Sequence, residues 1–330
     1  MKPVLRVAAA AATLLATAYC VTAATHDADA ESDSATAAAS TVLHSNDVDD
    51  VLVDEIHEQV LLSLPKVHEV VVTTLDGQIT RTISGISSPG EMTLNADASA
   101  AYVVEQNARR IARIDTRTYD VSHVEMPDGV CPFSVTYTAG RVWFSYGTVC
   151  SDRTSGRNGS LDPATGTVTT GLLGAWSGQI RALPDRPDRL VVASDQFIGV
   201  YDVSSPTPAT VVERDFGTSR SRCTDAALFH GGDSVATACA TPGDKVEVFH
   251  SSDLSSASFI RGDSTVHTLG ASANGQYVAV GSTYPYGCST VVDVSDGTPG
   301  TLVKRFGCID GSRQLRLGAM ALGPHRKLYT

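Results

Sequence analysis

The sequence LNADASAAYVVEQNARRIARIDT, residues 94–116, contains two short apolar strands joined by a polar turn, and the second of them closes on Ile114-Asp115. An equivalent apolar strand recurs along the chain, marked by Tyr102, Val142, Leu190, Val235, Tyr277 and Leu328. Successive markers lie 40, 48, 45, 42 and 51 residues apart. Short strands that repeat with this period are typical of a β-propeller, in which each repeat forms one four-stranded blade.

The repeat predicts six full blades and part of a seventh. The expected blades span residues 48–84, 90–126, 131–173, 178–213, 223–260 and 265–306. A seventh opens at 315–318 and has reached its second strand at Thr330. A propeller protects its strand edges only when the ring is complete. We therefore expect an all-β, seven-bladed propeller whose last blade is incomplete at the C-terminus, from a fragment or a truncated product. A six-bladed ring with a C-terminal extension is the alternative.

The first 23 residues have the composition of a secretory signal peptide. Lys2 and Arg6 precede an Ala/Leu/Thr run over 7–18, and small residues at cleavage-type spacing end at Ala18 and at Ala23. The run is too short and too rich in alanine for a membrane span. A lipoprotein signal would need a small residue before Cys20, where this chain has Tyr19.

Residues 24–46 are rich in Ala, Ser, Thr and Asp, and we expect a disordered acidic spacer there. The propeller then covers 47–330. The chain has a formal net charge of −11 and a pI near 5.2. This charge argues against nucleic acid and anionic membranes as partners. The sequence thus predicts a secreted protein, either free or associated with the cell surface, with no membrane span once the signal is removed.

Several segments resemble one family of propellers. They are 48–54, 57–63, 94–104 with 114–116, 141–147 with 159–162, and 200–204. Together they are similar to secreted actinobacterial YVTN/YncE-like β-propellers, of the kind that precedes immunoglobulin-like repeats. The resemblance covers residues 48–330 and implies further domains downstream. Its motifs specify blades and carry no catalytic residue.

Six cysteines remain after the signal, and an even number in an exported chain argues for disulfides. Antiparallel partners keep a nearly constant sum of residue numbers across a turn. This arithmetic pairs Cys131 with Cys150, Cys223 with Cys239, and Cys288 with Cys308. All six fall where strand one starts, strand two ends, strand three starts or strand four ends. These positions share one rim of the ring, which we name the cysteine rim.

Loops on the cysteine rim carry the candidate ligand-binding residues, because propellers bind through loops on a rigid scaffold. The candidates are Arg153, Arg157, Trp176, Arg181, Arg220, Arg222, Tyr284 and Tyr286. Arginines beside aromatic rings suit a carboxylate or a sugar acid. The alternative needs no ligand: arginine and tyrosine are common on exposed rims, and disulfides stabilise hairpins in many secreted proteins.

We expect a non-enzymatic scaffold or recognition module that binds an extracellular protein or glycan and needs no cofactor or metal. The sequence has no G-x-S-x-G or H-E-x-x-H motif. The alternative is a secreted hydrolase or lyase of the metal-dependent lactonase type. In that case the metal ligands would come from Glu105, Asn107, Asp195 and His267, although no spacing among them supports a site.

Overall fold

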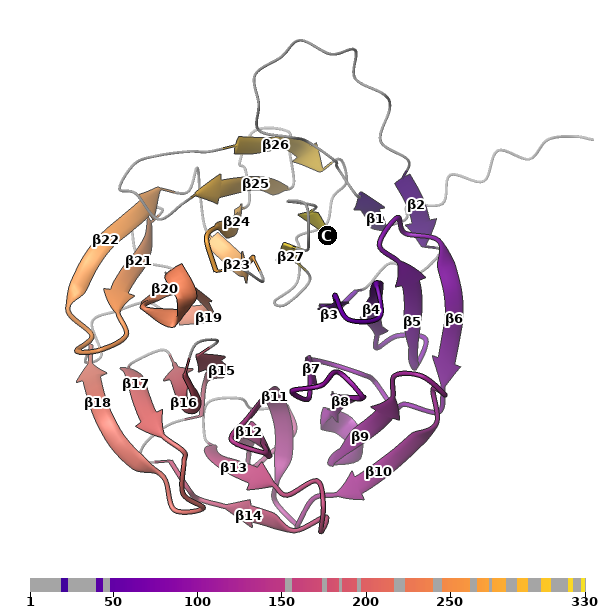
Figure 1. Cartoon of the computed structure of the whole chain (residues 1–330), viewed down its shortest axis with the longest axis horizontal. Helices are drawn as coiled ribbons and strands as arrows, with labels where there is room; N and C mark the ends of the chain where they lie inside the picture. The colour runs from indigo at the N-terminus through magenta and orange to yellow at the C-terminus, as the bar shows by residue number, and fades with distance from the viewer. Residues whose placement is uncertain are drawn as a thin grey trace, which may run out of the picture.

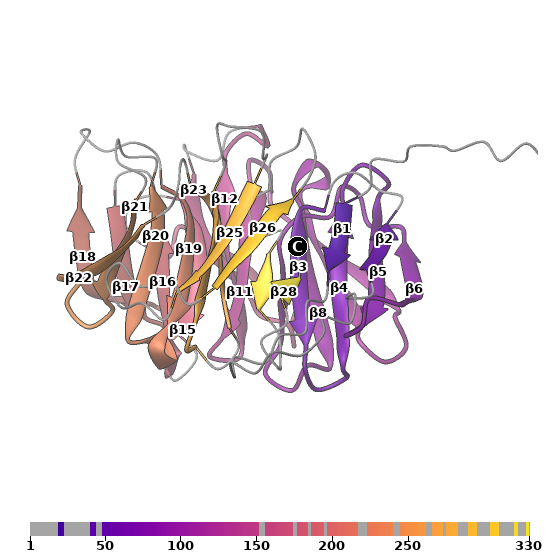
Figure 2. The same ribbon diagram turned by 90° about the horizontal axis from the view of Figure 1, so that it is seen from above.

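A computed structural model of the chain shows a ring of antiparallel sheets around a central axis (Figure 1), and the ring is a flat disc when seen from its edge (Figure 2). The structure describes residues 19–22, 40–43, 48–151, 156–173, 177–183, 186–194, 197–216, 223–239, 245–261, 266–272, 275–282, 290–295, 304–309, 320–322 and 328–329. The fold is an all-β propeller, as the period of the sequence predicts.

The first three blades are four-stranded sheets in chain order. Blade one contains β3 (Asp50–Asp54), β4 (Gln59–Leu64), β5 (Glu69–Thr74) and β6 (Ile79–Ser84). Blade two contains β7 (Met92–Leu94), β8 (Ala100–Glu105), β9 (Arg110–Asp115) and β10 (Val121–Glu125), with a 3-10 helix, η1 (Gln106–Ala108), after β8. Blade three contains β11 (Cys131–Thr138), β12 (Arg141–Gly147), β13 (Arg157–Leu161) and β14 (Val168–Thr170).

The next three blades repeat this order. Blade four contains β15 (Gln179–Leu183), β16 (Arg186–Ala193), β17 (Phe197–Asp202) and β18 (Ala209–Asp215). Blade five contains β19 (Cys223–Phe229), β20 (Ser234–Cys239), β21 (Lys245–His250) and β22 (Ser256–Arg261), with a second short 3-10 helix, η3 (His230–Gly232), after β19. Blade six contains β23 (Val266–Ala271), β24 (Val278–Ser282), β25 (Thr290–Ser295) and β26 (Lys304–Ile309).

The expected seventh blade opens with β27 (Ala321–Leu322) and β28 (Leu328–Tyr329), which pair with each other. The innermost strand β27 contacts both β23 and β3, so it lies between blade six and blade one. The sequence places the first strand of this blade at 315–318, which lies outside the described residues. The second-strand marker Leu328 is in β28, as predicted.

A strand pair from the start of the chain lies next to this blade. β1 (Tyr19–Thr22) pairs with β2 (Ser40–Leu43), and β1 contacts β28 (Figure 1). The prediction of a disordered spacer over 24–46 is therefore wrong for Ser40–Leu43. The reason is local composition, because Thr41, Val42 and Leu43 are the β-branched and apolar residues of an otherwise polar segment. The signal peptide over 1–23 stays a prediction.

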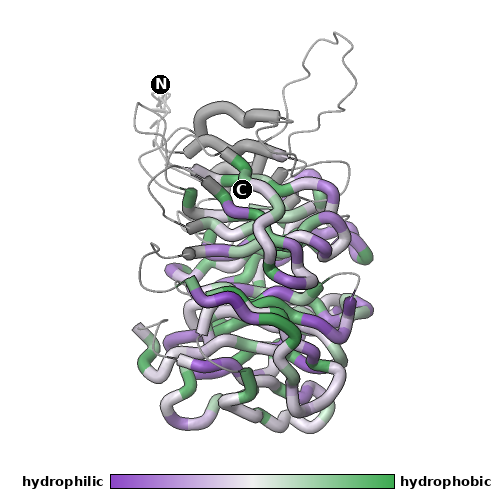
Figure 3. Tube along the Cα trace, turned by 90° about the vertical axis from the view of Figure 1, so that its left-hand side faces the viewer, coloured by the Kyte–Doolittle hydropathy of each residue, from purple (hydrophilic) through white to green (hydrophobic). Residues whose placement is uncertain are grey.

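The second strand of each full blade has an apolar central stretch because neighbouring blades cover both of its faces. In β4 and β8 every residue is buried, whereas four of the first five residues of the outer strand β6 are exposed. Hydrophobic stretches recur along the chain trace (Figure 3). The core that they form lies between blades: Leu61 and Val70 of blade one pack in one cluster with Val103 and Ala112 of blade two. Within the described part of the chain, no helix is long and apolar enough to cross a membrane.

Candidate functional site

The first strand of each of the six full blades is the innermost one around the central axis (Figure 1). One polar residue on this strand, or directly before it, forms a hydrogen bond to another blade. We name this set the inner belt. Its members are Asp50, Glu91, Ser134, Arg181, Asp225 and Thr268. They recur at the period of the repeat, so the ring geometry brings residues that are far apart in sequence to one level of the channel.

Four inner-belt side chains each accept a backbone N–H from the next blade. Asp50 Oδ2 accepts the N–H of Met92 at 2.6 Å, and Ser134 Oγ accepts that of Ile180 at 3.1 Å. Asp225 Oδ2 accepts the N–H of Leu269 at 2.9 Å, and Glu91 Oε1 accepts that of Val135 at 3.4 Å. Blades one, two, three and five are each joined in this way to the blade that follows, by a side chain that satisfies a backbone donor.

Arg181 connects three blades through two carboxylates. Its Nη1 donates to Glu91 Oε1, and its Nη2 donates to Asp225 Oδ1 at 3.2 Å. Asp225 is 1% exposed and Glu91 13% exposed, so both charges are held away from bulk water. Ser134 also donates to Glu91 Oε1 at 3.1 Å. The arginine therefore neutralises part of an acidic channel wall.

The belt contains three carboxyl groups and one guanidinium. Burial raises the pKa of Asp50 well above its usual range, and the nearby charge of Glu91 raises it further. Burial likewise raises the pKa of Glu91 and of Asp225, although Arg181 opposes the rise in both. Burial alone would lower the pKa of Arg181, but the three carboxylates raise it overall. The channel therefore favours protonation of its carboxyl groups.

These hydrogen bonds give the inner belt a structural role, because its side chains bond to one another and to backbone amides. This bears on Arg181, which the sequence suggests as a ligand-binding residue. Its guanidinium lies in the channel wall with two carboxylates and does not extend from a rim loop.

A pocket of about 410 Å³ opens on the cysteine rim between blades one and two. Its polar lining comes from segments just outside the strands: Asp49 before β3, Lys66 after β4, His68 before β5, and Asn107 in η1. Pro65, Val104 and Phe133 supply the apolar part. The volume is in the lower range for small-molecule sites.

A buried glutamate holds two walls of this pocket together. Glu105, at the end of β8, is fully buried and accepts two hydrogen bonds from Arg110, at 2.9 and 3.0 Å. His123 Nδ1 lies 2.7 Å from its Oε1, and the N–H of Ser87 donates to its Oε2. The connection between β6 and β7 is thus fixed against the end of β8, which suits a preformed site.

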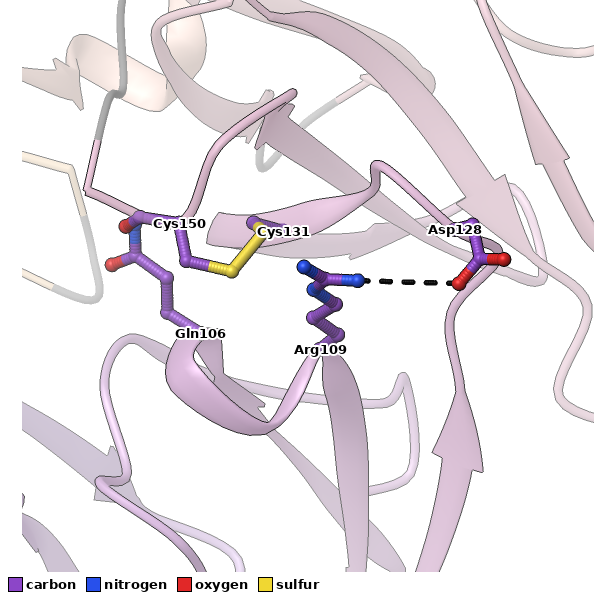
Figure 4. Close-up of a disulfide and its surroundings, with 5 residues drawn as sticks. All are labelled: Gln106, Arg109, Asp128, Cys131 and Cys150. Atoms are coloured by element: carbon purple, nitrogen blue, oxygen red, sulfur yellow. Dashed lines mark hydrogen bonds and ion pairs between the residues drawn. A yellow bond between two sulfur atoms is a disulfide. The ribbon is translucent and has the colours of Figure 1, made fainter.

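The disulfide braces the third wall. Cys131 and Cys150 are bonded, with an S–S distance of 2.07 Å, as the hairpin arithmetic predicts. Gln106 of η1 donates from Nε2 to the carbonyl of Cys150, and Figure 4 shows its side chain beside the disulfide. Arg109, directly after η1, forms an ion pair with Asp128 at 3.9 Å (Figure 4). The loop that carries Asn107 is therefore anchored at both ends.

Two residues of the pocket have left-handed backbone conformations that non-glycine residues rarely adopt. His68 has φ 60° and Ser88 has φ 48°. Ser88 also precedes Pro89, which further disfavours helical backbone conformations. The N–H of Ser88 donates to His68 Nδ1 at 2.9 Å, so the two residues stabilise one another. Strained residues of this kind cluster at functional sites.

Most of the residues proposed from sequence for ligand binding lie outside the described part of the chain: Arg153, Trp176, Arg220, Arg222, Tyr284 and Tyr286. Arg157 is exposed at the start of β13, on the cysteine rim. The structure brings neither Arg157 nor Arg181 into the pocket lining.

Of the other two cysteine pairs, the structure describes the backbone of Cys223, Cys239 and Cys308. Cys223 and Cys239 are directly opposed in the β19–β20 register, as predicted. Cys308 is in β26, and Cys288 lies outside the described residues. These two disulfides therefore stay predictions.

The residues named for the lactonase alternative are dispersed. Glu105 is bonded to Arg110 and His123, and Asn107 is exposed at the pocket. Asp195 and the side chain of His267 lie outside the description. Among the side chains that are described, no group of three or more His, Cys, Asp or Glu could hold a metal ion.

Comparison with known proteins shows the fold alone. No family model matches the sequence, and no curated protein matches it. Among solved structures, Kuenenia stuttgartiensis hydrazine synthase has a TM-score of 0.65 at 12% identity, over 86% of this chain and 92% of that one. The Cps50 (Swd1) β-propeller domain of Myceliophteria thermophila also has a TM-score of 0.65, at 11% identity, over 84% of this chain and 90% of its own. The chain is thus similar to β-propellers.

Proposed function

We propose that this protein is a secreted, non-enzymatic recognition or scaffold module that binds an extracellular protein or glycan through its cysteine rim. The observation that carries this proposal is the pocket on that rim, whose wall is braced by the Cys131–Cys150 disulfide. A disulfide suits an oxidising compartment, in agreement with the predicted signal peptide. Because this disulfide lies at the wall of the pocket, we propose that the cysteines of the rim hold ligand-binding loops in place.

We also propose that the chain belongs to a longer surface or secreted protein. The support is the resemblance of its blades to YVTN/YncE-like propellers that precede immunoglobulin-like repeats. In such a protein the propeller would present the cysteine rim while downstream domains hold it away from the cell. The net charge of −11 keeps anionic polymers from binding nonspecifically.

The test compares two exposed arginines on opposite rims. Arg157 lies on the cysteine rim, and Arg117 lies in the β9–β10 turn on the other rim. Labelled full-length secreted protein is applied to a glycan array and to a panel of purified extracellular proteins. We expect Arg157→Glu to weaken each specific signal at least fivefold and Arg117→Glu to leave it unchanged.

The opposite result, loss with Arg117→Glu alone, would place binding on the other rim and overturn the proposal. The same protein is also assayed on a lactone panel with added divalent metals. Turnover of any lactone would favour the lactonase alternative over a non-enzymatic role.

A further inference from the structure

The pocket between blades one and two has a lining rich in hydrogen-bond donors. The Lys66 ammonium has three N–H donors, so it can interact with a neighbouring group of this chain and still donate a hydrogen bond to a ligand. Asn107 and Ser88 add an amide and a hydroxyl. Asp49 supplies a carboxylate in the same lining. Lys66 and Asp49 contribute one formal charge of each sign, so the lining is locally neutral on a chain of net charge −11, and it suits a ligand that places one negative group on Lys66 and hydroxyls on Asp49.

The orientation of His68 adds a further donor. Its Nδ1 accepts the N–H of Ser88 at 2.9 Å. In the neutral ring the proton must therefore be on Nε2, which makes this nitrogen a donor. Lys66 and His68 lie two residues apart in the β4–β5 turn, so the ammonium and the imidazole N–H come from one short, strained segment.

The apolar part of the lining determines what kind of anion fits. Pro65, Val104 and the ring of Phe133 give the pocket a nonpolar surface beside its donors. A simple anion such as acetate or phosphate would leave this surface and most of the 410 Å³ unfilled. A sugar ring has an apolar face for the ring of Phe133 and hydroxyls for Asn107, Ser88 and Asp49.

We infer that this pocket binds a carboxylate-bearing sugar of the uronic-acid class, with the carboxylate on Lys66 and His68. The inference rests on the proposed recognition function and gives that function a ligand class. The disulfide and the Glu105 network keep the pocket preformed, so binding requires little ordering of the loops.

The experiment is a calorimetric and saturation-transfer NMR titration of the full-length secreted protein with sodium D-glucuronate. D-glucose tests the sugar without the carboxylate, and sodium acetate tests the carboxylate without the sugar. We expect glucuronate to bind at least tenfold more tightly than either. Equal binding of glucuronate and glucose, equal binding of glucuronate and acetate, or no binding of glucuronate would overturn the inference.

Two variants test the site by charge and by volume. Lys66→Gln removes the ammonium and should weaken glucuronate binding about tenfold or more, because hydrogen bonds to charged groups are the stronger ones. Gly90→Leu should fill the pocket. A Cβ at Gly90 would lie 3.4 Å from Asp49 Oδ2 and 3.6 Å from the carbonyl of Val104, which are ordinary contacts. This variant should therefore fold and abolish binding.

Arg117→Gln and Ala96→Leu are the matched controls, since both residues are exposed in turns on the opposite rim. Binding that survives both pocket variants, in proteins whose thermal midpoints match wild type, would refute this site. The rim test with Arg157→Glu is independent of glucuronate. If partner binding fails with Arg157→Glu but glucuronate never binds, the recognition function stands and the ligand class is wrong.

Discussion

Replacement of Arg181 by methionine tests whether the inner belt is held together by charge. Methionine keeps an unbranched side chain of similar length and removes the guanidinium that bonds Glu91 and Asp225. Loss of one partner from a buried ion pair costs about 3–5 kcal/mol. The Arg181 side chain is 24% exposed to the channel, so we take the lower end, about 3 kcal/mol at pH 8.

The loss should depend on pH in a defined direction. The pKa of Glu91 and that of Asp225 are already raised in the folded protein, and Arg181 opposes the rise. Without Arg181 both rise further. A carboxyl group with a raised folded pKa loses stability as the pH rises from its unfolded pKa through its folded one. Arg181→Met should therefore cost less at pH 5 than at pH 8.

The assay is thermal unfolding of wild type and Arg181→Met at both pH values. With about 2 °C per kcal/mol for a chain of this size, we expect a fall of about 6 °C at pH 8 and less than half of that at pH 5. Arg117→Met is the control, since Arg117 is exposed in a turn. An equal fall of the unfolding temperature at the two pH values would mean that the variant loses packing and not charge compensation. No fall at either pH would mean that the Arg181 ion pairs do not stabilise the fold.

Three further outcomes are expected. Asp50→Asn keeps an acceptor for its backbone donor and removes a buried charge, so it should stabilise the protein by on the order of 1 kcal/mol at pH 8 and by nothing at pH 4, as measured by denaturant unfolding. Replacing both Cys131 and Cys150 by serine should lower the free energy of unfolding by about 3 kcal/mol, because the disulfide between residues 19 positions apart no longer restricts the unfolded chain. An unchanged midpoint of urea unfolding would contradict this. N-terminal sequencing of the protein recovered from the culture medium should show a start at Ala24, which removes Cys20 and β1 as the predicted signal over 1–23 requires, and a start at Tyr19 would show that both are kept.

The blades could be predicted from sequence because each repeat has the same local requirement. A strand covered on both faces needs an apolar centre, so the apolar stretches around Tyr102, Val142 and Leu190 mark equivalent strands of successive blades. The Cys131–Cys150 pair followed from the same regularity, since antiparallel register fixes which ends meet.

The inner belt was missed because its members interact only in the closed ring. Asp50, Glu91 and Asp225 do carry a signal, since each is an acid at or beside an apolar first strand, at nearly the same phase of the repeat. Their bonds to the next blade follow from the curvature of the ring, which no single repeat encodes. Aligning the first strands of the repeats would have revealed them.

From the sequence we could predict the rim on which the pocket lies, but not the residues that line the pocket. Lys66 and His68 are in a four-residue turn of blade one, and Asn107 is in a turn of blade two. Their proximity depends on the left-handed conformations of His68 and Ser88, which are uncommon for residues other than glycine and which the sequence does not mark. Of the arginines proposed from sequence, the two that the structure describes, Arg157 and Arg181, are not in the pocket lining.

The contact of β27 with β3 sets an order of events during folding. Roughly 270 residues separate the two strands along the chain. Bringing the ends of such a loop together costs about 5 kcal/mol of chain entropy when the intervening residues are unfolded. If the six full blades have already formed, they hold the two ends near one another and most of that cost is gone. Blades one to six can therefore form in sequence during synthesis, and the contact of β27 with β3 forms after them.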